Sequence, residues 1–276
     1  MMKQFSIYAG VILALVLFLT SCGGNSKSSV PTEYCEELVK LAEEGNAEAQ
    51  VNLAKCYANG KGIEKSDEEA NKWIVKAAEQ GNADALTEMG NIYMMGLGVE
   101  VNYEEAIKWY LKAAEKEHPI AMVNLGLCYE DGKGVEKNMK EAFKWNLKAA
   151  EKGNIEAQRC VGNYYRYLYN EVGIQHDEVK AFDWYLKSAK QGLAGAQSEV
   201  AFSYVMGIGV GKDISKAIEW YTKAAEQNNA QALYNLGGCY INGEGVPQDV
   251  NKGVEYFKKA ASLGHEGAIR ALQAFQ

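Results

Sequence analysis

Apolar residues recur along most of this chain at the spacing of helices that each bury one face. Two neighbouring stripes illustrate the pattern: Ala106, Trp109, Tyr110 and Ala113, then Ala121, Leu125, Gly126 and Tyr129. Within each stripe the residues share one side of a helix, because they stand about three to four positions apart. Polar residues and glycine-rich segments separate the stripes. The pattern therefore predicts pairs of amphipathic helices joined by turns.

The two stripes return at a fixed period, which predicts an array of similar units. Five units have 36 residues and the fourth has 39; their ranges are 46–81, 82–117, 118–153, 154–192, 193–228 and 229–264. Positions are numbered here from the first residue of each unit, and units are called repeats one to six. Position 12 is Tyr in every repeat, and position 28 holds all five tryptophans of the protein. This registration predicts a solenoid in which each helix pair buries its apolar face against its neighbours.

Glycines occupy two phases of the repeat. A small residue stands at position 9, as Gly90 and Gly162 do, where a Trp or Tyr of a neighbouring helix can fill the space above it. Between the two helices lies G-x-G followed by Val or Ile, as in Gly207, Gly209 and Val210. The first of these glycines can end a helix in the left-handed conformation. A phosphate-binding loop is not expected, because the motif recurs between two helices and no strand precedes it.

The repeat resembles the Sel1-like repeat, a relative of the tetratricopeptide repeat. The matching pattern is A-x-x-x-L-G-x-x-Y-x-x-G-x-G-V followed by A-x-x-W-Y-x-K-A-A-x-x-G, and it covers the chain from Asn46 to Gly264. The resemblance implies an all-α, right-handed α/α superhelical solenoid. It also implies a concave inner face that binds proteins or peptides. Residues 33–45 and 265–276 look like single helices that would cap the two ends of the array.

The first 22 residues have the pattern of a lipoprotein signal. Lys3 precedes an uncharged stretch from Phe5 to Leu19, which as a helix would be about 22 Å long and shorter than a bilayer core of about 30 Å. The segment Leu19–Cys22 resembles the lipobox of bacterial lipoproteins. We therefore expect a signal peptide over residues 1–21, lipidation of Cys22 and a flexible tether over 22–32. An uncleaved N-terminal anchor helix is the alternative.

Composition and charge exclude several function classes. The formal net charge is −7, so a polyanionic duplex would be repelled and nucleic acid is not an expected partner. Only three histidines occur, and no Ser/His/Asp spacing, paired carboxylate motif or H-E-x-x-H is present. We expect no catalytic residue, no cofactor and no metal site. The protein is therefore predicted not to be an enzyme.

The cysteines suggest buried thiols rather than a zinc site. Cys56, Cys128 and Cys239 share position 11, which other repeats fill with residues such as Ile92. No C-x-x-C motif occurs. In an oxidising compartment, Cys35 and Cys56 are the one pair considered for a disulfide, since adjacent predicted helices carry them.

A candidate binding surface follows from analogy with tetratricopeptide arrays, in which positions 3, 6, 10 and 13 of the first helices line the inner face. From repeat three onward these positions become apolar and varied. The candidate residues are Ile120, Val123, Leu127, Phe202, Val205, Tyr234 and Ile241, with Arg159 and Arg166 among them. An apolar stripe of this kind suits a peptide or helix groove. Alternatively, the superhelix curls enough for these residues to pack on one another.

Repeat four departs from the pattern, because it has three extra residues and Leu168 in place of the first loop glycine. Tyr165 occupies the position of the core tyrosine. Tyr164, Tyr167 and Tyr169 form, with Arg166, either a recognition patch or a drifted loop.

Together these features predict a membrane-tethered scaffold of the bacterial cell envelope. Its expected partner is another protein or an extended peptide, bound on the concave face. The alternative is a cell-envelope protein that binds or modifies peptidoglycan or polysaccharide, since aromatic side chains on the inner face could stack on sugars.

Overall fold

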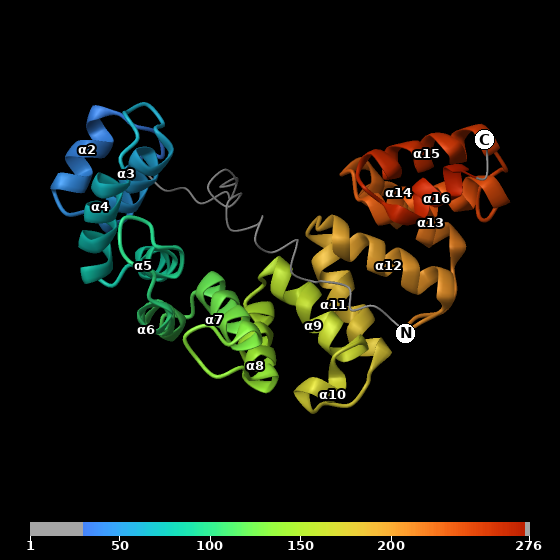
Figure 1. Cartoon of the computed structure of the whole chain (residues 1–276), viewed down its shortest axis with the longest axis horizontal. Helices are drawn as coiled ribbons and strands as arrows, with labels where there is room; N and C mark the ends of the chain where they lie inside the picture. Colours follow the sequence, from blue (N-terminus) through green and yellow to red (C-terminus); the bar gives the residue numbers. More distant parts are fainter. Residues whose placement is uncertain (1–29, 274–276) are drawn as a thin grey trace. The chain divides into compact units, whose positions relative to one another are not determined.

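The computed structural model describes residues 30–273, which form fifteen helices and no strand (Figure 1). The predicted signal peptide and the lipidation site Cys22 lie outside the described residues. No helix between Val30 and Gln273 is long and apolar enough to cross a membrane. The chain divides into two compact units, residues 1–113 and 114–276.

The first unit holds the single N-terminal helix and the first repeats. Its helices are α2 (Glu36–Glu43), α3 (Ala47–Asn59), α4 (Asp67–Glu79), α5 (Ala83–Met95) and α6 (Tyr103–Glu115), the last of which ends just beyond the boundary of the unit. Helix α3 packs against α4, and each of these two also packs against the helix next to it in the chain.

The second unit continues the same arrangement. Its helices are α7 (Pro119–Asp131), α8 (Met139–Glu151), α9 (Ile155–Arg166), α10 (Tyr169–Val172), α11 (Glu178–Lys190), α12 (Ala194–Met206), α13 (Ile214–Glu226), α14 (Ala230–Asn242), α15 (Val250–Ser262) and α16 (Glu266–Gln273). Helices of one repeat pair with each other, and the second helix of each pair packs on the first helix of the next. The prediction of an all-α solenoid of helix pairs is confirmed.

The helix ends lie where the sequence signals them. Asn46 and Asn154 each precede a first helix, and their side chains accept the N–H of Ala49 and Ala157. Asp213 caps α13 in the same way by accepting the N–H of Lys216. Except for α9, which ends before Tyr167, the first helices of the repeats end at glycines in the left-handed conformation, such as Gly60 with φ 64°.

The buried core residues stand at the same positions in successive repeats. The alanines at position 4 of all repeats are fully buried, from Ala49 in repeat one to Ala268 in the last helix. The phenol ring of Tyr110 lies against Gly90, and that of Tyr185 against Gly162, so the aromatic residue at position 29 fills the space above the small residue at position 9. This confirms the predicted role of the position 9 glycines.

Repeat three uses a different residue to fill this space. Its position 29 is Asn146, which lies against Gly126 and leaves room that Tyr164 of the next repeat occupies. Tyr164 is 1% exposed and packs edge-on against Phe143. The expectation that Tyr164 belongs to a surface patch is therefore wrong, because its ring completes the core.

Candidate functional site

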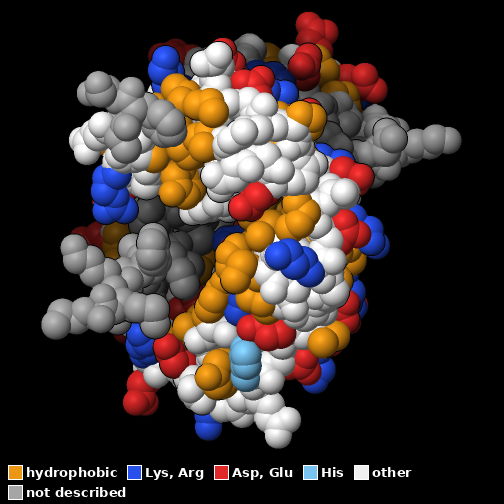
Figure 2. Space-filling view, turned by 90° about the vertical axis from the view of Figure 1, so that its right-hand side faces the viewer, with side chains coloured by type: hydrophobic (Ala, Val, Ile, Leu, Met, Phe, Trp, Pro, Cys, Tyr) orange, Lys and Arg blue, Asp and Glu red, His pale blue; other side chains and the backbone are white. Residues whose placement is uncertain are grey.

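The most distinctive surface of the second unit lies on its first helices. We give the name first-helix surface to exposed and partly exposed side chains on or directly after α7, α9 and α12: Ile120, Val123, Leu127, Arg159, Tyr167, Phe202 and Met206. The three helices are in direct contact, since Tyr164 of α9 donates a hydrogen bond to Glu130 of α7, and Arg166 of α9 to Glu199 of α12. Figure 2 shows one face of the molecule, on which hydrophobic side chains gather in patches between acidic and basic ones.

Large apolar groups of the first-helix surface remain open to water. Ile120 and Phe202 are each 36% exposed, while Val123 and Leu127 are partly buried. Tyr167 and Met206 are each 57% exposed, although positions 3, 6, 10 and 13 alone did not select them. Both stand at position 14, one residue beyond the expected stripe, so including position 14 would have found them.

Three of the predicted binding residues pack within the fold. Val205, Tyr234 and Ile241 are partly buried against the core formed by the last repeats. The ring of Tyr234 stacks on Phe257 with centroids 5.2 Å apart and on His265 with centroids 4.5 Å apart. For this part of the predicted stripe, the alternative that the residues pack on one another describes the structure better.

Arg166 also does not lie on the surface. It is 5% exposed, its Nε donates to Glu178 at 2.9 Å, and its terminal nitrogens donate to Glu199 at 3.1 Å and to Ser203 at 2.8 Å. Its guanidinium also lies 4.8 Å from the ring centroid of Tyr185. The prediction that Arg166 contacts a partner is wrong. Its side chain is buried, and its donors already bind acceptors within the protein.

Arg159 differs from Arg166 in its contacts. Its Nε donates to Glu156 of the same helix at 3.3 Å, and its aliphatic chain lies beside Gly195 of α12. Its side chain is 25% exposed. Since an arginine carries five donors, the two terminal nitrogens of Arg159 can still bind an acceptor on a partner.

A partly buried carboxylate lies next to this surface. Glu130 accepts a hydrogen bond from the hydroxyl of Tyr164, which also accepts one from Asn146 at 3.2 Å. Burial raises the pKa of Glu130, and burial with the nearby Glu130 carboxylate raises that of Tyr164. The three groups hold α7, α8 and α9 together, which is a structural role.

The five cysteines between Val30 and Gln273 are free thiols in this structure. Cys35 and Cys56 contact the same core cluster, but both are free. The Sγ of Cys35 instead accepts the N–H of Leu38 at 3.4 Å and so caps α2. The predicted disulfide is therefore not present. Within residues 30–273, no group of three or more His, Cys, Asp or Glu side chains is arranged as metal ligands.

A family model for the Sel1 repeat matches six segments, 47–82, 83–118, 119–154, 155–193, 194–229 and 230–265. The chain belongs to the Sel1 repeat family. Each matched segment begins one residue after the corresponding unit of the period described above. Sel1 repeat proteins generally mediate contacts between proteins.

Two solved structures show the same fold at substantial identity. The first is c5321, a protective antigen of uropathogenic Escherichia coli strains, with 35% identity and a TM-score of 0.76 over 84% of this chain and 49% of that one. The second is a Sel1 repeat protein from Oxalobacter formigenes, with 31% identity and a TM-score of 0.75 over 87% of this chain and 69% of that one. The chain thus spans about half the length of the E. coli protein. A comparison with curated proteins gives no match.

Proposed function

We propose that this Sel1 repeat protein is a lipid-anchored scaffold of the bacterial cell envelope that binds another protein or an extended peptide on its first-helix surface. The observation that supports the binding surface is the exposure of Ile120 on α7, Tyr167 directly after α9, and Phe202 and Met206 on α12. Exposed apolar groups stabilise a complex when a partner removes them from water.

Arg159 adds specificity to this surface. Its side chain lies beside Gly195 of α12, and its terminal nitrogens can bind a carboxylate or a backbone carbonyl of the bound segment. The partner that fits is an extended or helical segment with apolar side chains on both sides of a hydrogen-bond acceptor.

The binding surface is tested by photocrosslinking with the full chain in cells. A photoreactive amino acid at Phe202 should capture a protein partner, which mass spectrometry identifies. The matched control carries the same group at Val179, which is 59% exposed but lies on the second helix α11. Capture should be lost when Leu127→Asp is added to the Phe202 crosslinker. Equal capture from both sites, or capture that persists with Leu127→Asp, would contradict the proposal.

The glycan alternative is separated by a direct binding measurement. Tight binding of the full chain to peptidoglycan fragments, without any captured protein, would favour a sugar-binding role.

The anchor is tested at Cys22. Cell fractionation should find the protein with membranes, and Cys22→Ala should release it, because the acyl chains supply the attachment. Continued membrane association of the Cys22→Ala protein would refute lipid anchoring.

A further inference from the structure

Three repeats share a polar contact that fills the space between successive second helices. In repeat one, the side-chain amide of Gln50 donates to the carbonyl of Ala42 at 3.0 Å and accepts from Gln80 at 2.8 Å. We call this arrangement the glutamine bridge; it joins positions 5 and 35 of one repeat to position 33 of the helix before. The same bridge occurs in two other repeats, through Gln158 with Gln191 and Gln197 with Gln227.

Repeats two, three and six lack a glutamine at both positions of the bridge. In repeat three, Met122 replaces the glutamine at position 5, and Lys152 replaces that at position 35. The carbonyl of Ala114, which corresponds to Ala42 in repeat one, accepts the backbone N–H of Glu117 at 2.9 Å, and no glutamine side chain reaches it.

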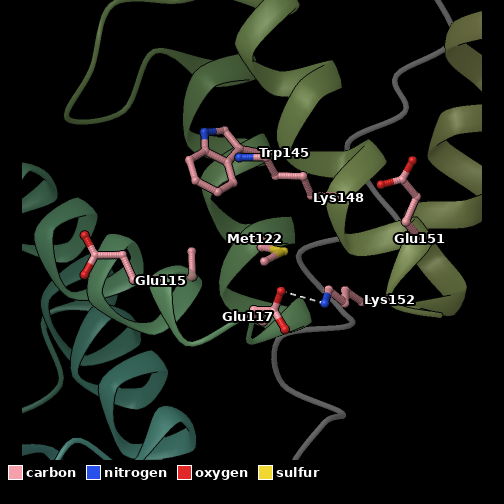
Figure 3. Close-up of a pocket in the computed structure, with 8 residues that line it drawn as sticks. Glu115, Glu117, Met122, Trp145, Lys148, Glu151 and Lys152 are labelled. Carbon is pink, nitrogen blue, oxygen red and sulfur yellow. Dashed lines mark ion pairs between the residues drawn. The ribbon is translucent and has the colours of Figure 1, made fainter.

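A hollow lies where the bridge is missing. It has a volume of about 490 Å³, and we call it the repeat-three hollow (Figure 3). Its lining residues are Ala114, Glu115, Glu117, Met122, Trp145, Lys148, Glu151 and Lys152. All of them belong to the second unit, and none is part of the first-helix surface.

Glu117 has an unusual backbone conformation at the edge of this hollow. Its φ is 61°, in the left-handed region, where the same turn has Gly81 after repeat one and Gly153 after repeat three. A residue other than glycine or asparagine costs about 1–2 kcal/mol in this conformation. The Glu117 carboxylate pairs with Lys152 at 2.7 Å (Figure 3). The strained residue therefore places a negative charge at the hollow.

The chemistry of the lining favours a cation. Three carboxylates and two ammonium groups give it a net charge of about −1 at neutral pH. Both ammonium groups already have a neighbour, since Lys152 pairs with Glu117 and Lys148 lies 4.2 Å from the ring centroid of Trp145. Glu115 and Glu151 supply the other two carboxylates, which lie at opposite sides of the hollow (Figure 3).

We propose that the repeat-three hollow binds an arginine side chain of a partner polypeptide. A guanidinium would take the place of the missing amide at position 35, because the buried Met122 already fills position 5. The guanidinium would pair with a carboxylate of the lining, while its aliphatic chain would lie against Trp145. This site goes beyond the proposed function, because it is a second contact point separate from the first-helix surface.

The test follows Trp145 during titration of the full chain with a short peptide. The protein is labelled with 5-fluorotryptophan, and fluorine NMR resolves its tryptophans; Trp145→Phe identifies the signal. The probe is acetyl-Gly-Arg-Gly-amide, and its control is the same peptide with citrulline, the neutral analogue of arginine. The arginine peptide should shift the Trp145 signal saturably, and the citrulline peptide should bind at least about tenfold more weakly.

A variant that should block the repeat-three hollow can be designed from the sequences of the other repeats. Met122→Gln with Lys152→Gln rebuilds the glutamine bridge of repeats one, four and five, so it should fill the hollow and weaken arginine binding at least about tenfold. The matched control makes the same exchange in repeat six, Leu233→Gln with Leu263→Gln, and should bind as the unchanged protein does. Glu117→Gly restores the usual residue of the turn and should weaken binding because one carboxylate is lost.

Three results would overturn the proposal. One is equal affinity for the arginine and citrulline peptides. Another is a Trp145 signal that does not respond specifically to the arginine peptide: either all tryptophan signals shift together, or the Trp145 signal does not shift at a saturating peptide concentration. The third is unchanged binding by Glu117→Gly, which remains decisive even when the rebuilt bridge fails to fold.

Discussion

Gly162→Ala tests whether the repeat depends on close contact between its two helices. A Cβ at Gly162 would lie 2.5 Å from Cε1 of Tyr185, whose side chain is fully buried. Tyr185 would have to move, and it would lose the hydrogen bond that its hydroxyl donates to Asn163 at 2.8 Å. Its contact with the guanidinium of Arg166, 4.8 Å from the ring centroid, would be disturbed as well.

Repeat five shows where the ring would go. Its position 9 is Ala201, and the hydroxyl of Tyr221 accepts a hydrogen bond from Asn235 of the next repeat instead. In repeat five the alanine at position 9 thus goes with a tyrosine whose hydroxyl bonds to the next repeat. In repeat four the hydroxyl of Tyr185 bonds to Asn163 of its own repeat, so an alanine in place of Gly162 would force this bond to change.

The expected size of the effect combines three contributions. Overpacking of a well-filled core costs about 1–3 kcal/mol, and loss of one hydrogen bond costs about 1 kcal/mol. Replacing glycine with alanine inside a helix contributes about 1 kcal/mol in the opposite direction. Gly162→Ala should therefore lower the free energy of unfolding by about 1–3 kcal/mol.

The matched control is Gly238→Ala in α14, where an added Cβ would meet no atom within 4 Å. Only the helix preference acts there, so this variant should gain about 0.5–1 kcal/mol. Urea unfolding followed by circular dichroism and tryptophan fluorescence measures both, with midpoints compared at equal slopes because repeat arrays can unfold in steps. If both variants move the midpoint in the same direction, the close contact does not govern the packing.

Other substitutions test the buried charges and the strained turn. Arg166→Ala should lower the unfolding free energy by about 3 kcal/mol, since its carboxylate partners lose their cation, while Lys180→Ala in an exposed pair should cost below about 0.5 kcal/mol. Equal losses in urea unfolding would contradict this. Burial raises the folded-state pKa of Glu130, so its stabilising effect is present at low pH and is lost as pH rises. Glu130→Gln should therefore gain stability relative to the unchanged protein between pH 4 and pH 8, and a constant difference would refute the assignment. Glu117→Gly should raise the unfolding midpoint by relieving about 1 kcal/mol of backbone strain.

The sequence predicted those parts of the fold that every repeat shares. Residues at fixed phases, such as Ala49 and Ala157 at position 4 and the glycine under Tyr185, lie where the period placed them. The reason is that each of these residues contacts the same neighbours in every repeat. The packing of these residues can therefore be predicted from a pattern that recurs six times.

The candidate site was less predictable, because it depends on contacts that occur once. Position 13 was expected to face a partner, but Arg166 turns inward since Glu178, Glu199 and Ser203 converge on it from two other helices. Tyr164 is buried only because position 29 of the repeat before is the small Asn146. Exchanges of single residues between repeats do not change the period, so the repeat pattern alone does not reveal these contacts.

Repeat three contains two departures from the pattern that have opposite outcomes. The loss of the aromatic ring at Asn146 is compensated, since Tyr164 fills the space and the Asn146 amide donates to its hydroxyl. The loss of the glutamine bridge is compensated only in part: Met122 fills position 5 at 4% exposure, but the hollow beside Lys152 and the strained Glu117 stays open. Compensation shows that this part of the fold can refill a vacated space when packing requires it. An open space beside a strained, charged residue therefore indicates a surface suited to a partner rather than an imperfect repeat.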